Sequence, residues 1–235
     1  MVGGKTSAPM CTFNPKQHRW IAHKKELATR LHCSVTALNE ELYVIGGEDH
    51  FNRVDKYDPS LDEWTEVASI KTGRAAHCAV VIGSLIYVLG GFDSHGCLTS
   101  MECFEPLTDQ WTDQSCMTYA RKFAGAAALG GKIFVVGGYA DMTWQTLRSS
   151  CEVFVPVMSQ RNVVSSPIVP RAACAMVSFD DHLYLFGGEN TEGKLDSVER
   201  YDVQNDKWEL FSTMPEKLSC LQASVLLLPK KYIDV

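Results

Sequence analysis

The sequence lacks the common signatures of catalysis and nucleotide binding. It has no Gly-x-Ser-x-Gly, no phosphate-binding loop and no His-Glu-x-x-His. Nine cysteines are present, but none forms a Cys-x-x-Cys pair, and there is no Asn-x-Ser/Thr glycosylation acceptor. The first residues do not form the apolar run of a signal peptide. We therefore expect reduced thiols and a cytoplasmic location.

Positive charge and long apolar runs are also scarce. The chain has 22 Lys and Arg against 28 Asp and Glu, a net charge of −6. Nucleic-acid binding usually needs a basic surface, so no nucleic-acid partner is expected. The most apolar stretch, 123–138, contains Lys132 and several glycines. Two strands meeting at a turn explain it better than a transmembrane helix does, and no membrane partner is expected.

What the sequence does contain is a repeat, marked by Gly-Gly pairs that end short apolar runs. The pairs lie at 3–4, 46–47, 90–91, 137–138 and 187–188. After each pair comes an aromatic residue, followed seven positions later by a Trp, or by an Arg in one copy: Phe13/Trp20, Tyr57/Trp64, Phe104/Trp111, Phe154/Arg161 and Tyr201/Trp208. The next Gly-Gly always begins 26 residues after that Trp or Arg. A repeat of this length predicts one closed array over residues 1–235.

Each repeat has room for four short strands. In the second repeat, 32–38 and 42–45 read as the first two strands, 54–57 as the third, and Trp64 lies on the fourth. Asp58 and Pro59 favour a turn between the last two. Four antiparallel strands in about 45 residues are typical of one blade of a β-propeller, so the expected fold is all-β. Trp20, Trp64, Trp111 and Trp208 are expected in its core.

The Gly-Gly, Tyr/Phe and Trp pattern resembles the Kelch repeat over almost the whole chain, and most closely the C-terminal propeller of the BTB-Kelch (Kelch-like) proteins. The resemblance implies a first blade split between the termini, closed by a C-terminal strand over 219–228. Such propellers typically have six blades, whereas five Gly-Gly pairs are present. The sequence leaves open a fragment, a short isoform, or Tyr232-Ile233 filling the gap. No BTB or BACK segment is seen.

Length variation is confined to the loop between the second and third strands, and loops on a rigid scaffold tend to carry binding residues. The resemblance places these loops on the rim where Kelch-like proteins bind partner peptides. The candidate partner-binding residues in them are His50, Phe51, Phe92, His95, Tyr139, Trp144, Arg148 and Asn190.

An arginine recurs ten residues after the Trp position, and a Leu replaces it in the fifth copy: Arg30, Arg74, Arg121, Arg171 and Leu218. The resemblance implies that these arginines line the mouth of the central cavity and hold acidic peptides, which suits the bidentate hydrogen bonding of a guanidinium. The alternative is that a repeated arginine braces loop carbonyls or pairs with an acid of a neighbouring blade.

The fourth repeat has the longest loop, 139–150, with Trp144 and Arg148 in it. These two residue types often dominate interface energies. The alternative is that Trp144 folds back to cover the space left by Arg161.

The resemblance implies a protein-recognition module that binds a protein substrate or a peptide motif. In full-length relatives, BTB and BACK segments would link it to a cullin-type E3 ubiquitin ligase. Two alternatives stay open: an actin-binding Kelch protein, and a small-molecule enzyme such as a copper oxidase or mutarotase on the same scaffold. The seven histidines are scattered, so no catalytic residue, metal or cofactor is expected.

Overall fold

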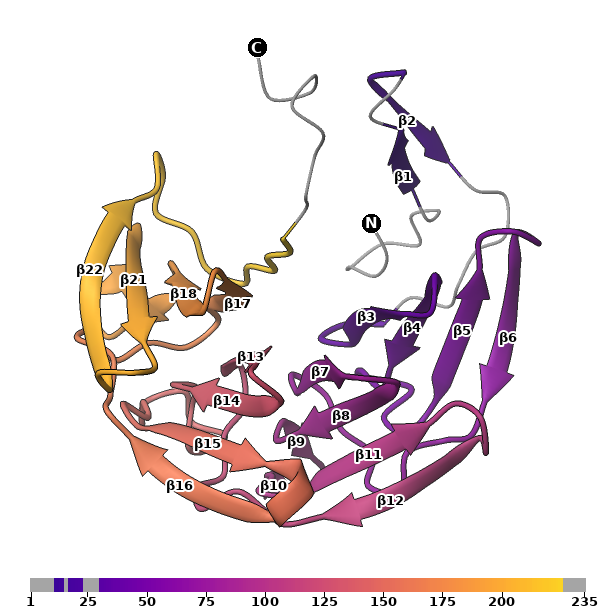
Figure 1. Cartoon of the computed structure of the whole chain (residues 1–235), viewed down its shortest axis with the longest axis horizontal. Coiled ribbons are helices and arrows are strands. Elements are labelled where there is room, and N and C mark those ends of the chain that lie inside the picture. Colours follow the sequence, from indigo (N-terminus) through magenta and orange to yellow (C-terminus); the bar gives the residue numbers. More distant parts are fainter. Residues whose placement is uncertain (1–10, 15–16, 23–29, 226–235) are drawn as a thin grey trace.

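The computed structural model describes residues 11–14, 17–22 and 30–225. Four four-stranded antiparallel sheets follow one another around a common centre, as blades of a propeller (Figure 1). We number them blade 2 to blade 5, after the second to fifth repeats. The observed architecture confirms the prediction of an all-β propeller. Within the described residues the arc of blades does not close on itself.

The four strands of each blade run in chain order from the centre outward, and the innermost strands of successive blades are neighbours. Their bounds are β3 (Ser34–Leu38), β4 (Glu41–Ile45), β5 (Val54–Asp58) and β6 (Glu63–Val67) in blade 2; β7 (Cys78–Ile82), β8 (Leu85–Leu89), β11 (Met101–Glu105) and β12 (Gln110–Gln114) in blade 3; β13 (Gly125–Leu129), β14 (Lys132–Val136), β15 (Cys151–Val155) and β16 (Gln160–Val164) in blade 4; and β17 (Ala175–Phe179), β18 (His182–Phe186), β21 (Ser197–Asp202) and β22 (Lys207–Thr213) in blade 5.

The remaining elements are short. Three two-stranded hairpins, β1–β2, β9–β10 and β19–β20, supplement the blades. The described residues contain one helix, a single 3-10 turn, so no helix in this part of the chain could span a membrane. The bounds are β1 (Cys11–Asn14), β2 (Arg19–Ala22), β9 (Phe92–Asp93), β10 (Gly96–Cys97), η1 (Pro156–Met158), β19 (Glu189–Asn190) and β20 (Gly193–Lys194).

The aromatic and Trp positions of each repeat face each other across the third and fourth strands. Phe104 pairs with Trp111 and Tyr201 with Trp208, with ring centroids 4.9 and 5.0 Å apart. Trp111 and Trp208 are buried, as predicted for core residues. Cross-strand aromatic pairs are a main source of sheet stability.

Trp111 and Trp208 also tie their blades to the preceding ones. The indole Nε1 of Trp111 donates a hydrogen bond of 2.8 Å to the carbonyl of Ala68, and Trp208 bonds Ser165 at the same distance. Arg161 performs both tasks in blade 4: its guanidinium stacks on Phe154, with the centroid 5.0 Å away, and donates to the Ser115 carbonyl. Arg161 therefore replaces the missing Trp and leaves no space for Trp144 to fill.

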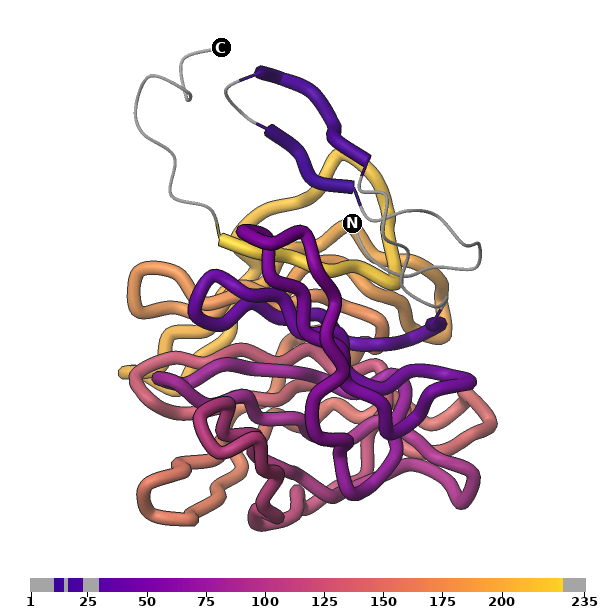
Figure 2. The backbone as a smooth tube through the Cα atoms, turned by 90° about the vertical axis from the view of Figure 1, so that its right-hand side faces the viewer, coloured from indigo at the N-terminus to yellow at the C-terminus, as the bar shows by residue number. Residues whose placement is uncertain are grey.

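Two predictions about the first repeat and the C-terminus are wrong. Trp20 is 61% exposed, because the hairpin β1–β2 that carries it joins no four-stranded sheet within the described residues. Figure 2 shows this hairpin apart from the four blades. No strand forms over 219–225, the described part of the expected closing strand. The Gly-Gly pair at 3–4 and residues 226–235 lie outside the described residues.

The Gly-Gly pairs are the points where each blade meets the loop that enters the next blade. The second glycine donates its N–H to that loop, as from Gly47 to the carbonyl of Arg74 at 3.0 Å. In blade 3, Gly91 has a φ of +88°, and a Cβ on it would lie 2.4 Å from the carbonyl oxygen of Ala75. Only glycine fits both the left-handed backbone and this close approach.

Candidate functional site

The four repeated arginines are buried, with 0–1% of their surface exposed. This corrects the prediction that they line the cavity mouth and bind acidic peptides, because no partner can reach their guanidinium groups. Of the alternative interpretation, the bracing of loop carbonyls describes the structure, whereas the acid that each arginine pairs with belongs to its own blade and not to a neighbouring one. The residues concerned are Arg30, Arg74, Arg121 and Arg171.

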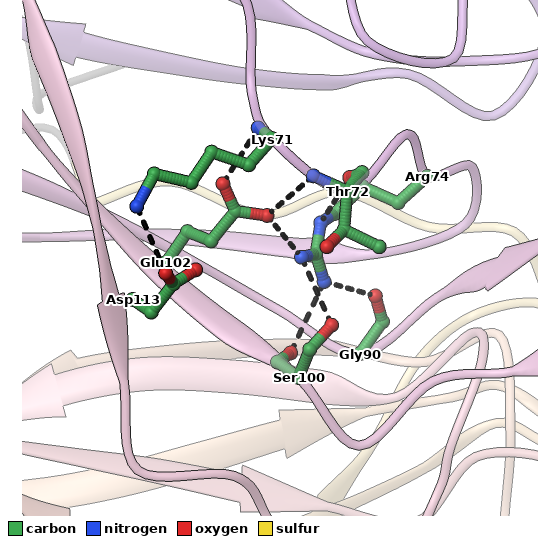
Figure 3. A network of polar contacts seen from close by, with 7 residues as sticks. All are labelled: Lys71, Thr72, Arg74, Gly90, Ser100, Glu102 and Asp113. Carbon is green, nitrogen blue, oxygen red and sulfur yellow. Dashed lines mark hydrogen bonds and ion pairs between the residues drawn. The ribbon is translucent and has the colours of Figure 1, made fainter.

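Arg74 is the template for this arrangement (Figure 3). Its Nη1 donates to the carbonyls of Gly90 and Ser100 at 2.9 and 3.1 Å. Its Nη2 donates to Ser100 Oγ at 3.1 Å and to the carboxylate of Glu102 at 2.6 Å. The main chain of Arg74 in turn accepts the N–H of Gly47 in blade 2. One residue thus supports the Gly-Gly loop of its own blade and holds that of the preceding blade.

The carboxylate of Glu102, the partner of Arg74, also has its hydrogen-bonding capacity used. Glu102 accepts the main-chain N–H groups of Lys71 and Thr72, at 2.7 and 3.0 Å, in the loop that joins blade 2 to blade 3. Burial lowers the pKa of Arg74, and the hydrogen bond and charge of Glu102 oppose that shift. A buried ion pair is tolerated when the remaining polar atoms are also hydrogen-bonded, as they are here. The network is therefore part of the scaffold.

The same network recurs in the other blades. Arg121 pairs with Glu152 at 2.7 Å, and Arg171 pairs with Glu199. Burial opposes ionisation of Glu152, but the N–H of Thr118 and the Arg121 guanidinium outweigh it, so its pKa is lowered. In blade 2 the shorter Asp55 takes the place of the glutamate.

Asp55 is shared between two arginines. It pairs with the buried Arg30 and accepts hydrogen bonds from both Nε and Nη2 of the half-exposed Arg53. Burial, and then the charge of Arg53, lower the pKa of Arg30 to about 10. Blade 2 thus keeps the buried pair with a shorter acid and adds a second cation beside it.

With the arginines assigned to the scaffold, the candidate site consists of the loops around them. We call the Gly-Gly rim the four loops 48–53, 92–100, 139–150 and 189–196, which follow the Gly-Gly pairs, together with the loops that join successive blades. The two kinds of loop lie side by side, because Ala75 pairs with Phe92 and Lys122 with Tyr139 through main-chain hydrogen bonds. The hairpin turns at the other ends of the strands form the opposite rim.

A row of aromatic side chains runs along the Gly-Gly rim. Phe51 and Phe92 are in edge contact, with centroids 6.1 Å apart. Trp144 lies 5.0 Å from Phe123 and 5.3 Å from Tyr139. We call these five residues the aromatic row. It joins loops of blades 2, 3 and 4. Phe51 and Trp144, at its two ends, lie more than 80 positions apart in the sequence.

Lys122 connects the two parts of the aromatic row. Its side chain is fully buried, and its Nζ lies 3.6 Å from the ring centroid of Trp144 and 5.3 Å from that of Phe92. No carboxylate within the described residues forms an ion pair with it. Burial lowers the pKa of Lys122, while Cys97 and Asp141 act in the opposite direction. The ammonium is held by cation–π contacts, which are strongest over Trp, and by a hydrogen bond of 3.7 Å to the sulfur of Met142.

Trp144 is fixed by these contacts although its backbone is strained. Its φ is +63°, a left-handed conformation that a bulky residue adopts only when its surroundings impose it. The side chain is still 47% exposed. The sequence-based preference for Trp144 as a surface residue agrees with this position, and the alternative of packing against Arg161 does not.

The other predicted residues of the rim differ in exposure. Tyr139 is buried and donates its hydroxyl to Glu189 at 3.0 Å; burial, then this bond, raise its pKa to about 12. The side chain of His95 is 90% exposed. Arg148 stacks on Tyr119, with the centroid 5.0 Å away, at one flank of the loop. Three others are half-buried: His50, Phe51 and Asn190.

Lys122 and Phe123 were missed by the sequence analysis. They follow Arg121 at positions where the other copies mostly have small or aliphatic residues, Ala75-Ala76 and Ala172-Ala173 among them. That departure from the repeat is the signal that could have identified them. Where two of the other copies have a pair of alanines, this copy has a lysine and an aromatic residue. The difference indicates that blade 4 is distinct at the rim.

The central channel offers no comparable chemistry. The inner strands enclose a cavity of about 260 Å³, in which His77 Nε2 lies 2.7 Å from Ser34 Oγ. Burial, then the charge of Arg74, lower the pKa of His77 to about 3, so the ring is neutral. Burial raises the pKa of the Cys78 thiol to about 12. Within the described residues no three His, Cys, Asp or Glu side chains could hold a metal ion.

Known families match the chain over most of its length. The family model described as the KLHDC2/KLHL20/DRC7 Kelch-repeats domain matches residues 2–149, and the Kelch motif matches residues 170–215. Kelch-like protein 7 of Rattus norvegicus is 40% identical over 92% of the chain. Kelch-like protein 23 of Homo sapiens is 28% identical over 82% of it.

The relatives are longer than this chain, which spans 37% of Kelch-like protein 7 and 35% of Kelch-like protein 23. Among solved structures, that of YjhT aligns with a TM-score of 0.73 over 87% of this chain and 77% of its own, at 17% identity. At this identity the likeness concerns the fold alone.

Proposed function

The chain belongs to the Kelch-repeat family, and from that premise we propose that it recognises a partner protein or peptide through the Gly-Gly rim. The observation that carries this proposal is the aromatic row, in which Trp144 remains 47% exposed although the repeat itself does not require it. Large aromatic residues on loops of a rigid scaffold are the groups that most often dominate protein interfaces.

The scaffold beneath the rim supports this role. Arg74, Arg121 and Arg171 each fix the Gly-Gly loop of their blade by four hydrogen bonds, as Arg121 does through Gly137, Ser150 and Glu152. Arg30 makes two hydrogen bonds, to the carbonyls of Val44 and Arg53, and an ion pair with Asp55. A loop held in this way presents its side chains with little loss of entropy on binding. The network that the sequence analysis assigned to the ligand therefore contributes to recognition indirectly, by holding the loops in place.

We further propose that in a longer protein the propeller is the substrate-receptor part of an adaptor for a cullin-type E3 ubiquitin ligase, working in the cytoplasm. Support comes from the similarity to Kelch-like proteins, of which the chain matches about a third of the length. All nine cysteines are free, in keeping with a reducing compartment.

The test is affinity capture from cell extract with the tagged chain, followed by mass spectrometry. Trp144→Ala and Phe92→Ala should remove the captured partner. The matched controls are Leu107→Ala and Val157→Ala, which are 92% and 94% exposed on the opposite rim and should leave capture unchanged. Equal capture by all four variants would contradict a binding site on the Gly-Gly rim. Capture of actin, checked by co-sedimentation with filaments, would favour the cytoskeletal alternative.

A further inference from the structure

In the part of the Gly-Gly rim that the structure describes, the charged side chains are predominantly negative once the buried arginines are set aside. Each of those arginines is matched by an acid inside its own blade, so none contributes free positive charge at the surface. The four loops that follow the Gly-Gly pairs carry three basic side chains against seven carboxylates: Arg53, Arg148 and Lys194 against Glu48, Asp49, Asp93, Asp141, Glu189, Glu192 and Asp196. The loops that join the described blades add one exposed basic side chain, Lys71, which pairs with Asp113.

The basic side chains of these loops are partly engaged. Arg53 pairs with Asp55 and Glu66, and Arg148 stacks on Tyr119. The acids are largely held in place by the loops themselves. Asp93 accepts the N–H of His95 at 2.7 Å, and Asp141 accepts the N–H of Thr143 at 2.9 Å. The Thr143 hydroxyl, the first of several hydrogen bonds, lowers the pKa of Asp141, which keeps it ionised.

The aromatic row already binds a cation of the protein's own. The ammonium of Lys122 lies over Trp144 and Phe92, in the position that a ligand cation takes over a π face. Because Lys122 is fully buried, a partner meets the surrounding rings and the carboxylates rather than this ammonium. An acidic partner would have to displace Trp144 to reach it, and would face the carboxylates first.

We propose that the Gly-Gly rim binds a basic peptide segment, whose arginine or lysine side chains stack on the exposed parts of the aromatic row and pair with the carboxylates of the loops. This rests on the proposed recognition function and specifies the chemistry of the partner. Arginine suits the site well, because its planar guanidinium stacks on aromatic faces and forms bidentate bonds with carboxylates. Attraction between a negative rim and a positive segment would also speed association at low salt.

The probes are two fluorescein-labelled peptides of equal length, one alternating Arg with Gly and Leu, the other with Glu in place of each Arg. Fluorescence anisotropy measures their binding to the whole chain at low and physiological salt. The Arg peptide should bind, more weakly at the higher salt, and the Glu peptide should not. Tighter binding of the Glu peptide, or binding of neither at millimolar concentration, overturns the proposal.

Matched variants separate the rim from overall charge. The triple variant Glu48→Gln, Asp49→Asn, Glu192→Gln removes three negative charges from the rim. The control Glu40→Gln, Glu105→Gln, Asp181→Asn removes three exposed ones from the opposite rim. The rim variant should weaken binding of the Arg peptide by about tenfold, equivalent to about 1.4 kcal/mol, and the control by less than about twofold. Equal losses would contradict the proposal.

The aromatic part has its own pair of variants. Trp144→Ala should abolish binding of the Arg peptide, and Trp144→Phe should retain most of it, because the π face is kept. Equal loss in both would mean that loop shape, not cation stacking, determines binding, and would overturn this part of the inference. If rim variants lose the captured cellular partner while the Arg peptide fails to bind, the recognition function stands and the basic-segment inference falls.

Discussion

The guanidinium of Arg121 and the carboxylate of Glu152 form an ion pair of 2.7 Å in which both side chains are fully buried. The two residues lie 31 positions apart. Arg121 is in the loop that enters blade 4, and Glu152 is on β15, its third strand. Equivalent pairs occur in the other blades, so this is a contact of the repeat. Its role is to join the entry of a blade to its Gly-Gly loop and third strand.

Breaking this pair should destabilise the fold. Arg121→Met or Glu152→Gln leaves an uncompensated buried charge, and the expected loss in the free energy of unfolding is about 3–5 kcal/mol. Urea denaturation followed by tryptophan fluorescence measures it. The exposed pair Lys71–Asp113 is the control, and Asp113→Asn should cost about 0–1 kcal/mol. An Arg121→Met variant that is as stable as the original chain but no longer binds the partner would instead show that Arg121 takes part in binding.

Two tryptophans at equivalent positions of the repeat should differ in importance. Trp208→Ala removes a side chain that is 5% exposed and bonded to Ser165, so a loss of about 3–5 kcal/mol is expected. Trp20 is 61% exposed, and Trp20→Ala should change stability by less than about 0.5 kcal/mol. Thermal unfolding of both variants checks this. A large effect at Trp20 would show that the hairpin β1–β2 packs into a blade in solution.

Replacing Gly91 tests why the Gly-Gly pair recurs. Its Cβ would lie 2.4 Å from the Ala75 carbonyl, whereas at Gly83, also left-handed, a Cβ would meet nothing within 4 Å. Both alanine variants bear the cost of a left-handed backbone, about 1–2 kcal/mol. Gly91→Ala should lose about 1–3 kcal/mol more, because the loop that enters blade 3 at Ala75 must move away. Similar unfolding midpoints for the two variants would rule out the close approach as the cause.

Protonation of His77 should couple stability to pH. The pKa of its imidazole is lowered from 6.5 to about 3 by burial, so the unfolded chain binds a proton that the folded chain rejects. Stability conferred by the neutral ring is complete above pH 6.5 and declines as the pH falls, by about 2 kcal/mol at pH 5. Denaturation at several pH values should show this slope, and His77→Gln should remove it. His95→Gln, at an exposed histidine, should not alter the slope.

Removing the ammonium of Lys122 should loosen the long loop of blade 4. Lys122→Met fills similar space but forfeits cation–π contacts worth about 2 kcal/mol when desolvated. The strained backbone of Trp144 would then lose one of its supports. Hydrogen exchange of residues 139–150 measures the effect, and faster exchange is expected there but not in blade 2. Unchanged protection from hydrogen exchange would mean that Phe123 and Tyr139 alone keep Trp144 in place.

Much of the candidate site could be located from the sequence, though not its chemistry. The loops after the Gly-Gly pairs vary in length, which predicted Phe92 and Trp144 as partner-binding residues, and both lie on these loops in the structure. The sequence left open whether the arginines face a ligand or brace the loops, because it does not show that their guanidinium groups are buried. Their partners are 25 to 31 positions away, beyond any local pattern. Lys122 was overlooked because a lone lysine looks like a solvent-exposed residue.

The sequence by itself determined the propeller, because strand periodicity, turn residues and the Gly-Gly spacing are local properties that the chain repeats in every blade. Only the tertiary structure decided which repeated residues are buried. Trp20 and Trp208 carry the same mark in the sequence, yet Trp208 packs on a neighbouring blade and Trp20 does not. Arg74 and its counterparts could be recognised as internal only once the carboxylates of their own blades stood beside them, since a buried charge is costly unless a partner compensates for its lost hydration.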